Sequence, residues 1–229
     1  MLPVELKGVR VVAFDLDDTL YPERDYAFGG FEAVAKWMTQ RMPCPFDPAR
    51  RMRELFDTEH RPRVFDQLLG ELGVEPGQPW VEQMIECYQN HRPRIALYPD
   101  AEEALARWSG RFRLALISDG PLSVQQSKIR ALGLESRLER IILTDAWGPE
   151  YWKPHPRAFR VIEAAWGVKG NTCMYIADNP GKDFWGPRQL GWQTVQVVRP
   201  GAVHADEIPP PGGQAEREVS SLSDLLLNY

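Results

Sequence analysis

The sequence predicts an α/β fold, a doubly wound Rossmann-like parallel sheet in three α/β/α layers with an inserted all-helical domain. Two observations support this prediction. Short apolar runs typical of buried strands alternate with segments of helical periodicity over most of the chain, and such alternation is characteristic of parallel sheets with right-handed crossovers. One long stretch, residues 21–96, breaks the alternation and has helical spacing of its apolar residues with no strand pattern.

The expected strands are short. The first, Val9–Phe14, is a nearly continuous apolar run, as in strands that are covered on both faces. Asp100 and Glu103 have the spacing of a capping box and predict a helix before the second strand. The remaining strands are expected at Leu114–Ile117, Ile141–Leu143, Cys173–Ala177 and Thr194–Val198.

Helical patterns fill the intervals between these strands. Residues after Val198 are expected to be irregular up to a last helix, expected at Ser221–Asn228. The predicted core therefore comprises residues 1–20 and 97–229, and residues 21–96 form the inserted helical domain. The helices between strands are expected at Leu122–Leu132, Pro156–Trp166 and Gly181–Leu190.

Composition narrows the class of protein. The chain has 229 residues, enough for one large domain with a second lobe, and its net charge of −5 argues against a nucleic-acid binder, which would have a basic surface. No apolar run is long enough to span a membrane. The N-terminal residues lack the layout of a signal peptide, and the three cysteines form no CxxC pair, so we expect a cytoplasmic protein with reduced cysteines. Nothing in the sequence indicates an oligomeric state.

Polar residues stand where the predicted strands end, which is where parallel sheets bind ligands. Converging carboxylates suit Mg²⁺, which prefers oxygen ligands. One carboxylate can attack phosphorus, and a second carboxyl group can protonate the leaving oxygen. A hydroxyl and a lysine can hold the phosphoryl oxygens. In chain order the candidates are Asp15, Asp17, Ser118, Asp119, Gly120, Lys153, Asp178 and Asp183.

These motifs, taken in order, resemble the four motifs of the haloacid dehalogenase superfamily. The stretch Asp15-Leu16-Asp17-Asp18-Thr19 is similar to the family's DxDxT. The resemblance implies that Asp15 is the nucleophile and that Asp17 is the general acid and base. It further implies a phosphoryl contact from Ser118, a charge-stabilising role for Lys153, and a Mg²⁺ site formed by Asp15, the backbone carbonyl of Asp17, Asp178 and Asp183. Asp183 would bind through water or pair with the lysine.

Several neighbouring residues are expected to complete the site. Asp119 stands where the family more often has Asn, and Ala177 where it often has Gly. Asp119 is expected to point away from a phosphate or to bond to backbone, and Asp18 to look outward or to cap the turn. The helix with Gln125 and Lys128 resembles the one that follows the second motif in the phosphatase branch. Substrate contacts are expected from Ser118, Asp119, Gly120 and Lys153, with Tyr21 and Arg24 at the entrance.

The second acid, Asp17, favours phosphoryl transfer, because dehalogenases of the family lack it. The prediction is a Mg²⁺-dependent phosphatase that hydrolyses a small phosphomonoester, such as a sugar phosphate or nucleotide, through an aspartyl-phosphate. The insert falls between the first and second motifs, as in the family's type-one helical caps. Such a cap closes over the site, so a phosphoprotein would not fit as a substrate. A phosphomutase of the β-phosphoglucomutase type and a non-catalytic binding protein with this fold remain alternatives. Mutases usually have Gly at the position of Asp18, so hydrolysis is favoured.

Overall fold

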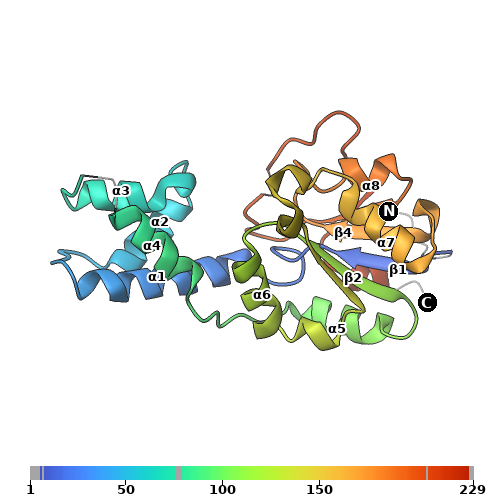
Figure 1. The fold of residues 1–229 in the computed structure, drawn as a ribbon, viewed down its shortest axis with the longest axis horizontal. Helices are drawn as coiled ribbons and strands as arrows, with labels where there is room; N and C mark the ends of the chain where they lie inside the picture. The colour runs from blue at the N-terminus through green and yellow to red at the C-terminus, as the bar shows by residue number, and fades with distance from the viewer. Residues whose placement is uncertain (1–5, 7, 76–78, 205, 227–229) are drawn as a thin grey trace. The chain divides into compact units, whose positions relative to one another are not determined.

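The computed structural model describes residues 6, 8–75, 79–204 and 206–226, which divide into two compact units (Figure 1). One unit combines the described residues up to Glu23 with those from Ile95 onward. The other unit comprises Arg24–Arg94. In the described residues, no helix is long and apolar enough to cross a lipid bilayer.

The first unit is built on a six-stranded sheet in which every neighbouring pair of strands is parallel, with the order β3-β2-β1-β4-β5-β6. This topology confirms the predicted doubly wound α/β fold. The strands are β1 (Val11–Phe14), β2 (Arg113–Ser118), β3 (Arg140–Leu143), β4 (Cys173–Ala177), β5 (Gln193–Val197) and β6 (Arg217–Val219).

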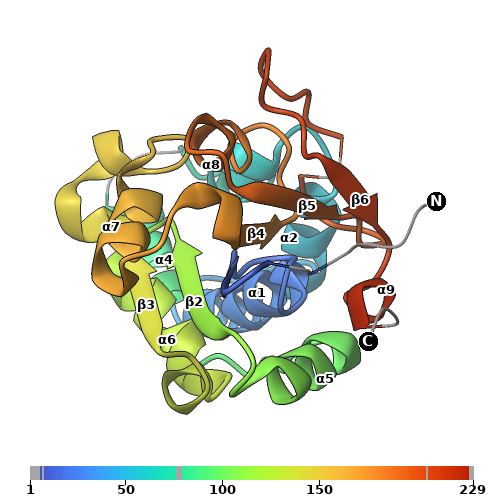
Figure 2. The ribbon, with the colours of Figure 1, turned by 90° about the vertical axis from the view of Figure 1, so that its right-hand side faces the viewer.

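Helices cover both faces of this sheet, with α5 and α6 on one side and α7 and α8 on the other (Figures 1 and 2). The two faces of β1 explain its continuous apolar sequence. Val11 and Ala13 pack in a cluster with Phe159 of α7, while the ring of Phe14 stacks on that of Trp108 in α5, with 5.9 Å between centroids. The helices are α5 (Pro99–Trp108), α6 (Leu122–Ala131), α7 (Arg157–Trp166), α8 (Trp185–Gln189) and α9 (Ser223–Leu226).

The strand order places β1 at a topological switch point. From β1 the chain winds outward through β2 and β3 on one side, and then through β4, β5 and β6 on the other. Two neighbouring crossovers therefore diverge next to the carboxyl end of β1, which is where ligands bind in sheets of this kind. Asp15 is the first residue beyond that end.

Two helices of this unit differ from the sequence predictions. The capping-box interpretation is wrong: Tyr98 is the N-cap of α5, Pro99 opens the helix, and Asp100 instead accepts hydrogen bonds from Arg199 and from the backbone of Leu222, both at 2.7 Å. Helix α8 is shorter than the expected Gly181–Leu190. Residues 180–184 form turns, because side-chain to backbone hydrogen bonds in this segment compete with the helix.

Strand β6 was not predicted, because two of its three residues are exposed and give no hydrophobic pattern. The last helix spans Ser223–Leu226, and the remainder of its predicted range, residues 227–228, lies outside the described residues. Short 3₁₀ helices occupy Arg61–Arg63, Leu134–Ser136, Thr144–Trp147, Pro149–Tyr151 and Gly170–Thr172.

In its described residues the second unit contains helices joined by turns and no strand, as predicted for this part of the chain. Gly30 of α1 allows this helix to approach α4 closely. A Cβ at Gly30 would lie 2.3 Å from a ring carbon of Tyr88, a separation that real side chains do not adopt. Its helices are α1 (Glu23–Thr39, which begins in the first unit), α2 (Pro48–Phe56), α3 (Val64–Glu71) and α4 (Trp80–Gln89).

Candidate active site

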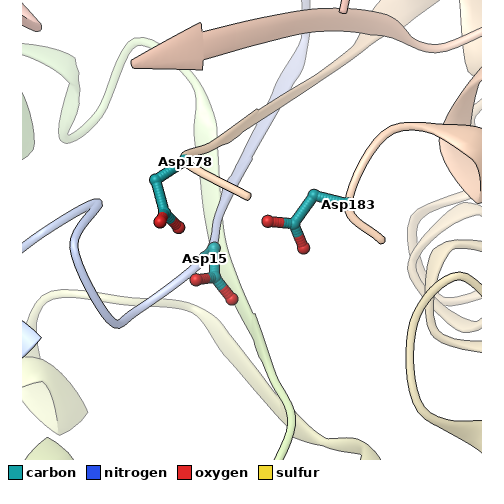
Figure 3. Close-up of side chains that lie close together, drawn as sticks. All are labelled: Asp15, Asp178 and Asp183. Atoms are coloured by element: carbon teal, nitrogen blue, oxygen red, sulfur yellow. The ribbon is translucent and has the colours of Figure 1, made fainter. Parts of the chain in front are cut away.

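Three buried carboxylates meet at the carboxyl edge of the sheet (Figure 3). Asp15 follows β1, Asp178 follows β4, and Asp183 lies five residues further along the chain. One oxygen from each side chain lies within 4.8 Å of the others. The backbone N–H of Asp15 donates to the carbonyl of Ile176 at 2.9 Å, which extends the pairing of β1 with β4 and brings their ends together.

Lys153 inserts its ammonium into this cluster. Its side chain is fully buried, contacts the Asp15 carboxylate, and lies 2.8 Å from Asp183 Oδ1 and 3.0 Å from the hydroxyl of Tyr175. Burial disfavours the ammonium form, but the nearby Asp15 and Asp183 carboxylates outweigh it and raise the pKa of Lys153 well above its usual range. Lys153 is therefore a fixed positive charge beside the predicted nucleophile.

One ammonium does not balance three carboxylates. Burial, followed by the charge of Asp183, raises the pKa of Asp15 to about 7 even though Lys153 opposes the shift. Burial and the charges of Asp15 and Asp183 also raise the pKa of Asp178 well above its usual range. Among the described residues, Asp178 Oδ2 is buried and has no hydrogen-bond partner. An unpaired carboxylate oxygen in an all-oxygen cluster fits Mg²⁺.

Asp17 lies apart from this cluster and has its own set of donors. Its carboxylate accepts hydrogen bonds from Lys128 Nζ at 2.7 Å, from Gln125 Nε2 at 3.2 Å and from the hydroxyl of Tyr21. Burial opposes ionisation of Asp17, but the charge and hydrogen bond of Lys128 outweigh it and lower the pKa of this carboxyl. Asp17 is thus held as a carboxylate that can accept a proton.

The end of β2 contributes the second predicted motif. Ser118 is the last residue of β2 and is buried. Asp119 bonds to backbone, as predicted: its carboxylate accepts hydrogen bonds from the backbone N–H of Lys153 at 3.2 Å, and also from Thr144 Oγ1 at 2.6 Å and Lys182 Nζ at 3.2 Å. These three donors make Asp119 a residue that positions the two lysines. The predicted substrate contact of Asp119 stays a prediction.

For the stretch after β1, one prediction is wrong and one is confirmed. Tyr21 does not line an entrance, because it is fully buried and its hydroxyl donates to Asp17. Asp18 caps the turn, the second of its two predicted alternatives: it is buried and accepts hydrogen bonds from the backbone N–H groups of Glu23 at 2.8 Å and Val203 at 2.6 Å.

Arg24 belongs to the helical unit, where its guanidinium pairs with Asp57 and lies 5.5 Å from the centroid of the Phe56 ring. Its predicted contact with substrate stays a prediction. Gly120 has a φ of +108°, a backbone conformation that favours glycine. A Cβ there would lie 3.1 Å from Gln125 Nε2, so the glycine leaves room for the amide that holds Asp17.

Sequence reasoning missed Lys182. Its ammonium binds Asp119, and its charge favours ionisation of Asp15. The available signal was its position directly before Asp183 in the fourth motif. Glu23, the first residue of α1, has its pKa raised to about 8 by burial and then by the charge of Asp17.

Similarity to known proteins agrees with this geometry. The chain is 29% identical over 196 residues to the glyceraldehyde 3-phosphate phosphatase of Pyrococcus furiosus, covering 83% of this chain and 81% of that protein. It is 32% identical over 175 residues to the phosphoserine phosphatase of Thermus thermophilus, covering 76% and 61%. It is also 30% identical over 131 residues to the (S)-2-haloacid dehalogenase of Xanthobacter autotrophicus, covering 57% and 49%.

A solved structure of YfnB from Bacillus subtilis, bound to magnesium, has the same fold, with a TM-score of 0.70 and 20% identity over 96% of this chain and 99% of that one. The family model of haloacid dehalogenase-like hydrolases matches residues 9–191, which contain all four motifs. Together with the sheet topology and the four motif positions, this match shows that the chain belongs to the haloacid dehalogenase-like hydrolase family.

Proposed function

We propose that this protein is a Mg²⁺-dependent phosphatase that hydrolyses a small phosphomonoester through an aspartyl-phosphate on Asp15. The observation that carries the proposal is the partly buried carboxylate of Asp17, two residues after Asp15 and held by three donors. Transfer of a phosphoryl group to Asp15 from an alcohol needs a proton for the leaving oxygen, and Asp17 is placed to handle that proton. Relatives named for glyceraldehyde 3-phosphate and for phosphoserine support a small phosphorylated substrate.

In the proposed first step, an Asp15 carboxylate oxygen attacks phosphorus while the bond from phosphorus to the leaving oxygen breaks. Asp17, having taken up a proton, transfers it to that oxygen. In the second step Asp17 removes a proton from water as the water attacks phosphorus, and the bond from phosphorus to Asp15 breaks. Phosphate leaves and the Asp15 carboxylate is restored.

The remaining residues of the site stabilise charge. Lys153 and Ser118 would hold phosphoryl oxygens, and the charge of Lys153 also favours ionisation of Asp15. Asp15, Asp178 and Asp183 would hold Mg²⁺, which supplies positive charge to the phosphoryl oxygens. Oδ2 of Asp178 has no hydrogen-bond partner within the part of the chain that the structure describes, which supports this assignment.

We further propose that the inserted helical domain, predicted at residues 21–96, serves as the cap that selects the substrate. The separation of Arg24–Arg94 as its own compact unit supports this proposal. Because a cap restricts access, the substrate would be a free metabolite and not a phosphoprotein.

A dehalogenase is the second candidate, favoured by the similarity to the (S)-2-haloacid dehalogenase. In that reaction Asp15 would attack carbon and displace a halide. Neither a general acid for the leaving group nor a metal ion would be required, so the held Asp17 and the all-carboxylate cluster would have no use. The phosphatase therefore accounts for more of the site.

Measuring product release from phosphomonoesters and from a 2-haloacid distinguishes the phosphatase from the dehalogenase. We expect release of phosphate from p-nitrophenyl phosphate, glyceraldehyde 3-phosphate or phosphoserine that needs Mg²⁺ and stops with a chelator. Asp15→Asn should lower this rate by about 10⁴-fold or more, while Glu103→Gln, on the exposed face of α5, should leave it unchanged. Halide release from a 2-haloacid, without phosphate release from any phosphomonoester, would contradict the proposal.

A further inference from the structure

Helix α6 places two polar side chains, Gln125 and Lys128, on its buried face. Only 6% of the Lys128 side chain is exposed, and its Nζ lies 2.7 Å from Asp17 Oδ1. Burying an ammonium group is costly unless it is paired, and an apolar residue would fill this position on the face of α6 at lower cost. The pairing with Asp17 therefore needs an explanation beyond packing.

The three donors divide the Asp17 carboxylate between them. Lys128 and the hydroxyl of Tyr21 reach Oδ1, whereas the amide of Gln125 reaches Oδ2. A carboxylate bonded at both oxygens cannot rotate about its terminal torsion, which is otherwise broad. The orientation of Asp17 is therefore fixed before any substrate binds.

The same donors are tied to the rest of the site. Gln125 Nε2 also donates to the backbone carbonyl of Asp119, which follows Ser118. Tyr21 is joined to Asp17 by a backbone β-bridge as well as by its hydroxyl. The ammonium of Lys128 lies 6.0 Å from the centroid of the Tyr21 ring, so the donors contact one another as well as Asp17.

We propose that Lys128 is a positioning residue that, together with Gln125 and Tyr21, fixes the Asp17 carboxyl group for proton transfer to the leaving oxygen of the substrate. This role rests on the proposed phosphatase function and adds a substrate class to it. An alkoxide leaves poorly without a proton, whereas p-nitrophenolate leaves without one. A site that fixes its general acid in this way suits alkyl phosphomonoesters.

The test compares Lys128→Met with wild type by kcat/KM on two substrates, the alkyl phosphate glyceraldehyde 3-phosphate and the aryl phosphate p-nitrophenyl phosphate. The value of kcat/KM reports only the steps up to departure of the leaving group, so the later attack of water does not affect it. We expect a loss of about 10- to 100-fold on the alkyl phosphate and less than about threefold on the aryl phosphate. Arg130→Met, which removes an exposed cation from the same helix, should change neither value.

Tyr21→Phe keeps the test decisive if Lys128→Met does not fold, because it removes a single hydroxyl from a buried ring. It should give a smaller loss with the same preference for the alkyl substrate. Equal losses on both substrates, in whichever variants fold, would overturn the positioning role while leaving the phosphatase intact. A wild-type protein that hydrolyses neither phosphate would instead overturn the proposed function itself.

Discussion

The ion pairs of the candidate active site and the ion pairs on the surface of the helical unit differ in burial. In the sheet-containing unit, the side chains of Lys153 and Lys128 are 0% and 6% exposed, and both ammonium groups contact acids of the first motif. In the helical unit, Arg53 and its partner Glu32 are 41% and 59% exposed. Exposed pairs contribute little to stability, whereas a buried pair is costly to form and costly to break. The buried ion pairs are therefore those of the candidate active site, whereas the exposed pair lies on the surface of the helical unit.

Removing the ammonium from the carboxylate cluster should give the largest effect. Lys153→Met leaves Asp15 and Asp183 without their buried counterion, and we expect the free energy of unfolding of the metal-free protein to fall by about 3–5 kcal/mol. Urea denaturation measures this loss. Lys169→Met, an exposed lysine, is the matched control and should change the free energy very little. A loss for Lys153→Met as small as that of the control would show that the ammonium is not a structural counterion.

The protonation of Glu23 predicts a smaller, pH-dependent effect. Its pKa is raised from 4.5 to about 8, so between these values the folded protein keeps a proton that the unfolded chain releases. The unfolded state binds fewer protons in this window, and stability therefore falls as pH rises through it. The Glu23 side chain is 28% exposed, and we expect its contribution to be about 1–2 kcal/mol.

Urea denaturation of wild type and Glu23→Gln at about pH 5 and about pH 8 measures this contribution. The difference in stability should favour Glu23→Gln at the higher pH and shrink at the lower one. A difference that does not change with pH would mean that Glu23 is ionised in the folded protein across this range.

The exposed pair should give the smallest effect. Glu32→Gln removes the charge that faces Arg53 and should change the free energy of unfolding by less than about 1 kcal/mol. Raising the salt concentration should reduce even this difference, because exposed charges are screened. A larger change that persists in high salt would remove the contrast between the two units.

The sequence was sufficient where one segment determines its own structure. The strand Cys173–Ala177 was predicted with its observed bounds because it is apolar on both faces, and the first, third and fourth motifs placed Asp15, Lys153, Asp178 and Asp183 in one cluster. It was not sufficient where distant segments meet. Asp100 has the spacing of a helix cap, yet it holds Arg199 and the start of the last helix.

The donors around the site were hidden for the same reason. Lys182 follows a Gly in a turn and has no periodicity to mark it, and its contact with Asp119 joins residues 63 positions apart. Tyr21 looked like the first residue of an exposed insert. Its burial depends on the turn capped by Asp18, which brings the Tyr21 hydroxyl back to Asp17. Such contacts follow from the turn and the sheet together.

The central claim is that Asp15 attacks phosphorus, and the stereochemical course at phosphorus tests it most directly. Attack by Asp15 followed by attack by water inverts phosphorus twice, so a phosphorothioate substrate made chiral at phosphorus with oxygen isotopes, turned over in isotopically labelled water, should release thiophosphate with overall retention of configuration. Inversion would contradict the account, because it would mean that water attacks phosphorus directly in a single displacement.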